Sequence, residues 1–138
     1  MKKVALALSG GVDSATAAML LLKEGYHVTG VTFRLFGEDL SEVNAAKTVC
    51  EALEIEHIVA DYRDIFKKTV EEPFIDAYVS AMTPNPCIFC NKNVKFGIFM
   101  EEFLNRGFDF VSSGHYARIT RGHDGYRILK AKNLKKDQ

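Results

Sequence analysis

The sequence predicts an α/β protein built on a doubly wound parallel β-sheet. Two observations lead to this prediction. Short apolar runs alternate along the chain with longer segments in which apolar residues recur at helical spacing. The run nearest the N-terminus, VALAL, is apolar at every position, as is typical of parallel strands that helices cover on both faces. We therefore expect a ligand to bind at the carboxyl edge of the sheet, where loops follow the strands.

The beginning of the chain predicts a strand, a helix and a second strand. Residues 4–8 (VALAL) are the first strand candidate, and a helix is predicted over residues 15–23, before Gly25. The second strand candidate, residues 28–33 (VTGVTF), is rich in β-branched residues. The helix is expected to turn one apolar face toward the sheet, made of Ala15, Ala18, Met19 and Leu22.

The alternation continues through the middle of the chain. Asp39 or Ser41 can cap a second helix, and residues 57–60 (HIVA) then predict a third strand. Residues 62–82 predict two helical pieces with a break near Pro73, because proline suits the first turn of a helix. The second helix carries an apolar face made of Val43, Ala46, Cys50 and Leu53.

The last third of the chain predicts one more helix, a strand and a hairpin. A helix over about residues 91–106 is closed by Gly107, and residues 108–112 supply a fourth strand. The stretches 116–120 and 126–129 flank the turn sequence GHDG and predict a C-terminal β-hairpin. This order of elements is Rossmann-like, and three loops fall at one edge of the sheet, at residues 9–14, 33–40 and 113–116.

Length and composition indicate one domain with a basic C-terminal end. The 138 residues are 47% hydrophobic, which suits a single core. Net charge is zero, but residues 1–80 hold 8 Lys or Arg against 13 Asp or Glu, whereas residues 117–138 hold 7 against 2. A basic end attracts polyanions such as nucleic acid, although a lysine-rich terminus can also be simply solvated. The chain has three cysteines, and this odd number favours reduced thiols. We expect no membrane span and no secretory signal, and therefore predict a cytoplasmic protein without a membrane partner.

The loop SGGVDS, between the first strand and the first helix, is a candidate phosphate site. Backbone N–H groups point outward at a helix N-terminus, and the helix dipole favours an anion there. Gly10 and Gly11 permit close approach of the backbone, Ser9 and Ser14 add hydroxyl donors, and Asp13 could hold a metal ion that bridges phosphate oxygens. The mononucleotide and dinucleotide glycine motifs are absent from the sequence. A glycine turn with a polar helix cap is the alternative.

SGGVDS resembles the PP-loop of the ATP pyrophosphatases, a group that includes GMP synthetases, NAD synthetases and tRNA-thiolating enzymes. The resemblance implies an adenine nucleotide alpha hydrolase-like fold. It also implies cleavage of ATP between the α and β phosphates, which transfers AMP to a substrate oxygen and releases pyrophosphate. This loop indicates the chemistry and leaves the substrate open.

The segment TPNPCIFCNKNVKFG, residues 83–97, predicts a stiff loop that leads into a helix. Its prolines favour extended backbone, so that Cys87 and Cys90 lie near the helix N-terminus, where the pKa of a thiol is lowered; Lys92 and Lys95 add positive charge nearby. Either thiol could be a nucleophile, or the pair could hold half of a zinc or iron–sulfur site or cycle as a dithiol. Cys50, on an apolar helical face, is expected to be a buried core thiol.

The order ALSGGVDS, TPNPCIFCNKNVKFG, SSGHYARI and KKDQ resembles the tRNA-specific 2-thiouridylase family (MnmA/TrmU) over the whole chain. That resemblance implies adenylation of the C2 oxygen of a wobble uridine, in tRNAs of the Lys, Glu and Gln types, followed by sulfur delivery from a persulfide. It also implies ATP, Mg²⁺ and a sulfur-donor protein. The residues expected by position to bind ATP are Ala7, Leu8, Ser9, Gly10, Gly11, Val12, Asp13, Ser14, Phe33 and Gly114.

The same resemblance assigns the catalytic and tRNA-binding residues. Cys90 is the expected nucleophilic cysteine, with Cys87 and Asp13 as further catalytic candidates. The residues expected to contact tRNA are Asn85, Pro86, Cys87, Lys136, Asp137 and Gln138. Many relatives have aspartate where this chain has Cys87, which leaves a paired-thiol variant with an iron–sulfur cluster open. The family is more than twice this length, so residues 1–138 are expected to be its N-terminal adenylation domain, without the central tRNA-binding and C-terminal β-rich domains.

Other chemically interesting residues have structural interpretations. His115 could bond to substrate or orient its loop, and the latter is favoured. His27, His57 and His123 show no ligand spacing, and Asp61 and Asp64 are expected at a helix start. Core packing is expected at three helically spaced aromatic residues, Phe96, Phe99 and Phe103.

Two functions compete with the adenylation domain of a 2-thiouridylase. One is a different PP-loop sulfur transferase or amidotransferase that acts on a small molecule or another RNA position, with Cys87 and Cys90 as cluster ligands. The other is an ATP- or AMP-binding module without catalysis. The first predicts activity that does not depend on the relevant tRNAs, and the second predicts nucleotide binding without turnover.

Overall fold

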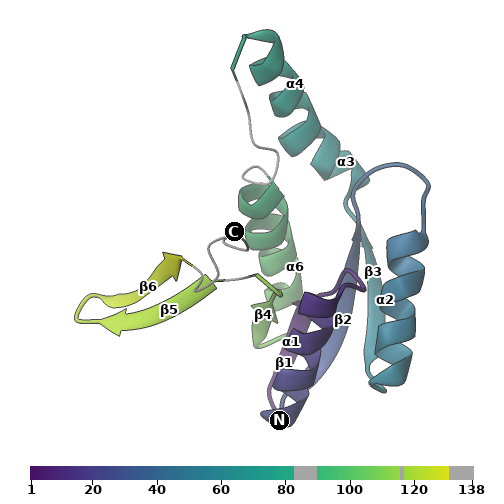
Figure 1. The fold of residues 1–138 in the computed structure, drawn as a ribbon, viewed down its shortest axis with the longest axis vertical. Helices are drawn as coiled ribbons and strands as arrows, with labels where there is room; N and C mark the ends of the chain where they lie inside the picture. The colour runs from purple at the N-terminus through teal and green to yellow at the C-terminus, as the bar shows by residue number, and fades with distance from the viewer. Residues whose placement is uncertain (83–89, 116, 131–138) are drawn as a thin grey trace.

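The computed structural model describes residues 1–82, 90–115 and 117–130 and consists of a four-stranded parallel sheet with helices on both faces (Figure 1). The strands are β1 (Lys3–Ala7), β2 (His27–Arg34), β3 (Glu56–Asp61) and β4 (Phe110–Ser112), and their order in the sheet is β3-β2-β1-β4. The doubly wound α/β prediction is confirmed. The strand β1 lies between β2 and β4. From β1 the chain therefore builds the sheet outward through β2 and β3, and it later crosses back to add β4 on the other side of β1.

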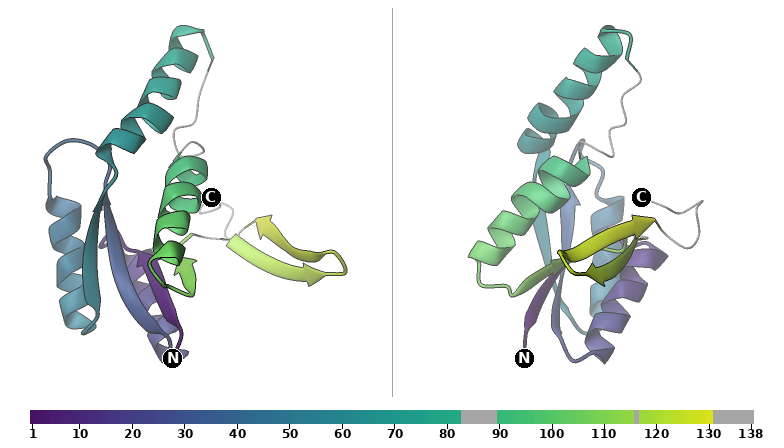
Figure 2. Two further views of the ribbon diagram at one scale, coloured as in Figure 1. Left: turned by 180° about the vertical axis from the view of Figure 1, so that it is seen from behind. Right: turned by 90° about the vertical axis from the view of Figure 1, so that its left-hand side faces the viewer.

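Two helices cover one face of the sheet, α1 (Val12–Lys23) and α2 (Ser41–Ala52) (Figure 2). Cys50 is 1% exposed, which confirms the prediction of a core thiol, and burial raises the pKa of this thiol. The helix α2 can lie close to β2 only because residue 30 is glycine. A Cβ atom on Gly30 would stand 2.6 Å from the Sγ atom of Cys50.

The apolar face of α1 agrees with the predicted one at Ala18 and Leu22 but not at Met19. Met19 is 59% exposed, whereas Ser14 and Ala18 are buried and Leu21 packs with them against the sheet. The helix starts at Val12, earlier than the apolar spacing indicates, and its buried line begins with a hydroxyl group. A count of apolar residues gives no weight to serine, so the pattern missed Ser14 and assigned Met19 to the buried face.

The opposite face is covered by a continuous helical segment made of the π-helix η2 (Asn91–Ile98) and α6 (Phe99–Asn105) (Figure 2). Phe99 and Phe103 are buried as predicted, but Phe96 is 50% exposed. The π-helical turn has more residues than an α-helical turn and rotates Phe96 away from the core. Gly97 accommodates this turn, because a Cβ atom there would lie 2.9 Å from the carbonyl oxygen of Lys92.

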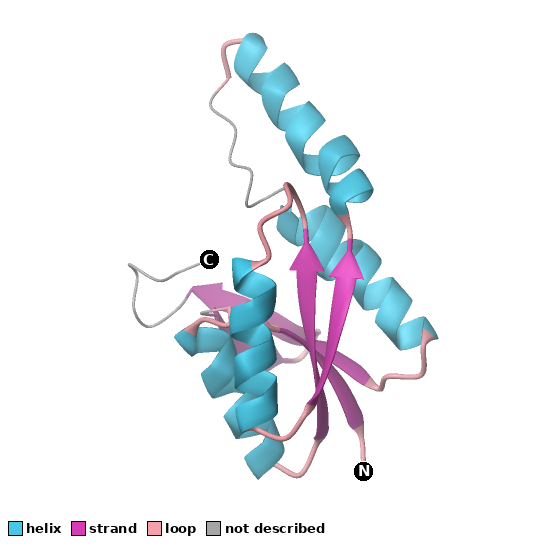
Figure 3. Ribbon diagram, turned by 90° about the vertical axis from the view of Figure 1, so that its right-hand side faces the viewer, coloured by secondary structure: helices cyan, strands magenta, loops and turns pink. Residues whose placement is uncertain are grey.

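A helical arm continues beyond the carboxyl ends of the strands (Figure 3). It comprises α3 (Arg63–Phe66), η1 (Lys67–Glu71) and α4 (Glu72–Val79), with Pro73 in the first turn of α4 as predicted. The predicted break near Pro73 is wrong, because Glu71 and Glu72 keep helical backbone angles and the helix runs on without interruption. The carbonyl oxygen of Thr69, which a proline at residue 73 cannot pair with, accepts a hydrogen bond from the side chain of Asn93. Asp61 accepts a hydrogen bond from the backbone N–H of Arg63 at 3.2 Å, which confirms its place at a helix start. The buried Tyr62 at the base of the arm donates to Glu102 on α6 at 2.5 Å, and this bond ties the arm to the second helical layer.

The C-terminal hairpin is present as predicted and projects from the main sheet (Figure 1). It consists of β5 (Ala117–Gly122) and β6 (Gly125–Lys130), which pair in antiparallel register across a turn at His123 and Asp124. Among the helices of the described residues, none is long and apolar enough to span a lipid bilayer.

Candidate functional site

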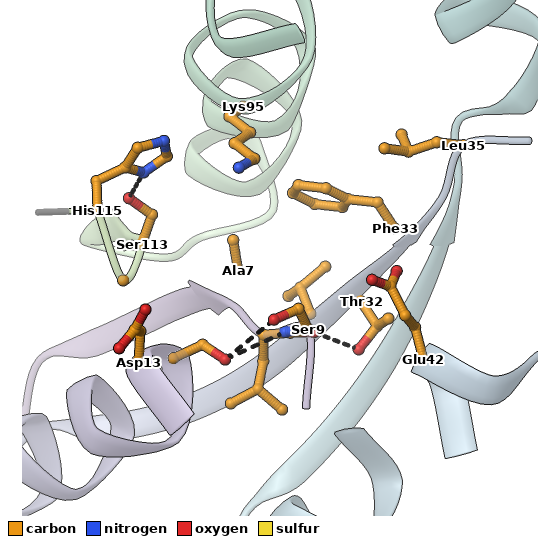
Figure 4. Close-up of a pocket in the computed structure, with 14 residues that line it drawn as sticks. Ala7, Ser9, Asp13, Thr32, Phe33, Leu35, Glu42, Lys95, Ser113 and His115 are labelled. Carbon is orange, nitrogen blue, oxygen red and sulfur yellow. Dashed lines mark hydrogen bonds between the residues drawn. The ribbon is translucent and has the colours of Figure 1, made fainter. Parts of the chain in front are cut away.

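The carboxyl ends of β1, β2 and β4 open onto a cavity of about 260 Å³ (Figure 4). This is the point at which the sheet reverses its winding, and it is where α/β proteins of this class bind ligands. Residues from both helical layers contribute to its wall. The lining residues are Ala7, Leu8, Ser9, Asp13, Ser14, Val31, Thr32, Phe33, Leu35, Glu42, Lys95, Ser113, Gly114 and His115.

Most of the predicted nucleotide-binding residues meet at this cavity. Ala7, Leu8, Ser9, Asp13, Ser14, Phe33 and Gly114 line it. Val12 and Asp13 also line a second hollow beside it, between α1 and the loop after β4. Gly10 and Gly11 shape the loop without lining the main cavity.

The loop between β1 and α1 is held by hydrogen bonds between its two serines. The hydroxyl group of Ser14 donates to the carbonyl oxygen of Gly11 at 3.3 Å and accepts from the backbone N–H of Ser9 at 3.3 Å. Gly10 adopts a φ of +83°, and a Cβ atom there would lie 2.7 Å from the Cβ of Ala45 on α2. Glycine is therefore required at this position by both backbone conformation and space.

The N-terminus of α1 presents backbone N–H groups to this edge of the sheet. Gly11 precedes the helix in an extended conformation, and no side chain of the described residues caps the helix by a hydrogen bond. Gly114, in the loop after β4, approaches the first turn so closely that a Cβ atom would stand 3.0 Å from the backbone nitrogen of Ser14. The two loops thus form a backbone-lined cradle at a helix N-terminus, which favours an anion.

A buried threonine braces the end of β1 at the cavity floor. Thr32 donates its hydroxyl proton to the carbonyl oxygen of Leu8 at 2.7 Å and lies 2.8 Å from Nε2 of His57. Because a carbonyl oxygen can only accept, the hydroxyl oxygen must accept from an Nε2–H of His57. Burial, with a smaller effect from Lys47, lowers the pKa of His57 and favours the neutral ring. His57, which shows no ligand spacing in the sequence, therefore supports the site from behind.

The β2 end of the cavity is apolar on one side and acidic on the other. The ring of Phe33 projects into the cavity and contacts the ring of Phe99 edge-on, with centroids 5.0 Å apart (Figure 4). Leu35 lies beside it, and Glu42, in the first turn of α2, faces them. Glu42 was not among the predicted site residues, because a glutamate in a first helical turn is common and carries no signal of its own.

His115 connects the β4 loop to the helical segment η2. Its Nδ1 lies 2.5 Å from the hydroxyl oxygen of Ser113, and its Nε2 lies 3.2 Å from Oδ1 of Asn91. Burial, and to a lesser degree the charge of Lys95, lowers the pKa of His115. The neutral ring then donates from Nε2 to Asn91 and accepts the hydroxyl proton of Ser113. The ring of Phe96 packs against it at 5.6 Å between centroids.

Of the two predicted catalytic cysteines, the described residues include Cys90, at the start of η2. Its thiol is partly buried and packs at the margin of the core between the sheet and η2. Cys50 lies in the core on the other face of the sheet. Among residues 1–82, 90–115 and 117–130, no group of three or more potential metal-binding side chains is present.

Other predicted site residues lie outside the described part of the chain. These are Asn85, Pro86, Cys87, Lys136, Asp137 and Gln138. Conversely, Lys95 lines the cavity although the sequence indicated only that its charge lies near the thiols. Its place in the cavity wall depends on how η2 packs against the sheet, which no local pattern specifies.

Known proteins match this chain over almost its whole length. The family model described as the tRNA methyl transferase HUP domain matches residues 2–138. Proteins named tRNA-specific 2-thiouridylase MnmA are 42% identical over 149 residues in Clostridium botulinum (strain Eklund 17B / Type B) and 43% identical over 147 residues in Treponema denticola. Each alignment covers 99% of this chain but 41% and 40% of the relative, so the chain spans about two-fifths of the length of these proteins.

Solved structures share the fold. A protein described as a predicted subunit of tRNA methyltransferase from Methanocaldococcus jannaschii has a TM-score of 0.60 at 23% identity, over 83% of this chain and 53% of that one. A glutamine-dependent NAD⁺ synthetase from Acinetobacter baumannii, in complex with ADP, has a TM-score of 0.54 at 19% identity, over 80% of this chain and 20% of that one. At these identities the likeness concerns the fold alone. The family model and the identity to the curated relatives together show that this chain belongs to the tRNA-specific 2-thiouridylase (MnmA/TrmU) family, of which it carries the HUP domain.

Proposed function

We propose that this chain is the adenylation domain of a tRNA 2-thiouridylase, which binds ATP and transfers AMP to the C2 oxygen of a wobble uridine. The observation that carries the proposal is the meeting of the SGGVDS loop, Gly114 and Phe33 around one cavity at the winding reversal of the sheet. The curated relatives, which are named for 2-thiolation, are 42–43% identical to this chain over 99% of its length. These names favour thiolation over the methyl transfer in the name of the family model.

The cavity suggests how the nucleotide is oriented. The cradle formed by Gly10, Gly114 and the first turn of α1 suits phosphate, because backbone N–H groups and the helix dipole both favour an anion there. The apolar wall at Phe33 and Leu35 suits the adenine ring. The phosphates are therefore proposed to lie at α1 and the adenosine at the end of β2.

A magnesium ion fits the donors at the phosphate end. Mg²⁺ in phosphoryl sites is commonly held by one or two carboxylates together with substrate phosphates and water, and Asp13 lines the cavity beside the cradle. When bound, the ion would supply charge that stabilises the departing pyrophosphate. Asp13 would hold it, and Ser9 and Ser14 would position the loop through the hydrogen bonds described above.

Adenylation makes the C2 oxygen of uridine a better leaving group. A uridine carbonyl oxygen is a poor leaving group, and conversion to an AMP ester allows sulfur to displace it from C2. Cys90 is proposed as the thiol that takes part in sulfur transfer, with Cys87 beside it in sequence and the residues Asn85 and Pro86 near the base. A base in a folded anticodon loop must be splayed out to reach this site, at a cost of a few kcal/mol. Contacts of the basic C-terminal end, including Lys136, Asp137 and Gln138, to tRNA of the Lys, Glu and Gln types would offset that cost.

An iron–sulfur cluster is less well supported than a thiol mechanism by the described residues. Cys90 and Cys50 lie in cores on opposite faces of the sheet, so Cys50 cannot join Cys90 as a ligand. A cluster with Cys87 and Cys90 would need its remaining ligands from outside these residues. We therefore propose that the two thiols act in sulfur transfer from a donor protein.

The proposal is tested by the products formed from ATP and Mg²⁺ with a tRNA transcript that has a wobble uridine. AMP and pyrophosphate are expected with that transcript and not with one in which the wobble base is cytidine. Asp13→Ala should abolish AMP formation and weaken Mg²⁺-dependent ATP binding, whereas the matched control Asp76→Ala, at an exposed position on the arm, should behave as the wild type. ADP as product, or unchanged ATP affinity in Asp13→Ala, would refute the assignment. ATP binding without AMP formation would favour a binding module.

A further inference from the structure

The cavity has a cation in its wall that was not among the predicted nucleotide-binding residues. Lys95 comes from η2, on the opposite helical layer from the SGGVDS loop, and its amino group points into the cavity (Figure 4). Among the described residues that line this cavity, Lys95 is the one lysine or arginine. Asp13 and Glu42 are the acidic side chains of the same wall. An anionic ligand in this cavity would meet its main positive side-chain charge at Lys95.

Lys95 lies between the two ends of the cavity. The phosphate cradle at α1 lies at one end, and Phe33 with Glu42 lies at the other (Figure 4). Lys95 projects from above the middle, over the end of β1 at Ala7. Its charge also contributes to the lowered pKa of His115, which places the two side chains on one side of the cavity. The middle of the cavity is where the phosphate attached to the ribose would lie.

We propose that Lys95 is a catalytic residue that binds the α-phosphate of ATP and stabilises the negative charge that develops there during adenylyl transfer. This inference rests on the proposed function, which supplies the orientation of ATP. The sequence placed Lys95 beside the cysteines, but the structure turns its side chain into the cavity. A fixed cation at the reacting phosphate stabilises the charge that develops there, and it needs no reorganisation during the reaction.

The transfer step is balanced with the groups that the proposal names. The uridine C2 oxygen forms a bond to the α-phosphorus, and the bond from that phosphorus to the bridging oxygen breaks. Pyrophosphate leaves with the electron pair of the broken bond, the uridine N3 releases its proton to solvent, and no group is oxidised or reduced. Lys95 remains protonated throughout and exchanges no proton with the substrate.

The surrounding structure holds Lys95 in this position. Asn91, one helical turn before it, is bonded to His115, which is bonded in turn to Ser113 in the loop after β4. Val94, the preceding residue, is fully buried and fixes the helix against the core. The π-helical segment is therefore anchored through Asn91 and Val94, which directly precede Lys95, and such anchoring favours preorganised electrostatic stabilisation.

The first test compares the binding of adenosine, AMP and ATP to the wild type and to Lys95→Ala, Lys95→Arg and Lys68→Ala by calorimetry. Lys68 is exposed in the other π-helical segment, η1, and serves as the matched lysine control. For Lys95→Ala we expect about tenfold or greater loss of affinity for AMP and ATP, because a charge-assisted hydrogen bond is lost, and an unchanged affinity for adenosine. Lys95→Arg should recover part of the loss, and Lys68→Ala should match the wild type.

The second test measures tRNA-dependent AMP formation at saturating ATP. A group that stabilises charge in the transition state should cost about 100-fold or more in rate when it is removed. A wild-type protein that does not prefer AMP to adenosine would refute the proposed orientation of the nucleotide, and this inference with it. If the wild type binds AMP more tightly than adenosine and Lys95→Ala keeps this preference, the role of Lys95 is overturned but the orientation of the nucleotide is not. Loss of affinity without loss of rate would overturn the catalytic part.

Discussion

The close contact between β2 and α2 predicts strong coupling between Gly30 and Cys50. In Gly30→Ala the new Cβ atom would stand 2.6 Å from Sγ of Cys50, at least ~0.8 Å closer than ordinary van der Waals contact. Helix α2 would have to move outward, and overpacking of this kind costs about 1–3 kcal/mol of unfolding free energy. Cys50→Ala alone removes one buried atom and should cost about 1 kcal/mol.

The double variant should be more stable than the sum of the single effects predicts. With Sγ removed, the methyl group introduced at position 30 occupies the vacated space, so we expect a favourable coupling of about 1–3 kcal/mol. Urea unfolding followed by far-ultraviolet circular dichroism measures all four free energies of the cycle, and the shared slope checks that the unfolded state is comparable. Single effects that add to within about 0.5 kcal/mol would show that α2 does not rest on Gly30 as described.

Three further predictions concern the residues around the site. Thr32→Val should destabilise the protein by about 1–3 kcal/mol in urea unfolding, because it leaves the Leu8 carbonyl and the Nε2–H group of His57 unpaired, whereas Thr32→Ser should lose less than half as much. His57 and His115 have pKa values lowered from 6.5, so the folded state binds fewer protons than the unfolded state. The free energy of unfolding should therefore fall as the pH drops below 6.5. A pH series of unfolding midpoints should show a less steep fall in His57→Gln and in His115→Gln. Phe103→Ala should cost about 3–5 kcal/mol and Phe96→Ala much less in the same assay, since one ring is fully buried and the other is half exposed; equal losses would contradict the rotation of η2.

The SGGVDS loop shows how much of a loop's structure the local sequence can predict. SGGVDS follows an apolar run and precedes a helical pattern, and the structure confirms that order, from β1 to α1. The need for glycine at residue 10 reflects a φ of +83°, a local property that sequence can suggest. The second reason, contact with Ala45 on α2, is tertiary and has no local signal. A polar loop between two periodic elements was thus sufficient to predict where the cavity lies, but not how its walls pack.

Errors in the predicted faces have one cause. Met19 and Phe96 both fall on apolar helical lines in the sequence, yet both are largely exposed. At Ser14 the buried line of α1 includes a hydroxyl group, and at η2 the helix is wound with more residues per turn. An apolar periodicity assumes an ideal α-helix with a wholly apolar face, so it cannot register either departure.

The amino-acid sequence alone determined the order of strands and helices, the place of the SGGVDS loop between β1 and α1, the core position of Cys50 and the family to which the chain is similar. These features follow from local spacing and from residue types within a few positions of one another. Tertiary structure alone decided which residues surround or support the cavity at the carboxyl edge of the sheet, namely Lys95, Glu42, Thr32 and His57. Those residues come from separate elements whose mutual distances depend on how η2 and α2 pack on the sheet. That packing is set by contacts between residues far apart in the chain, and no local pattern of residues encodes it.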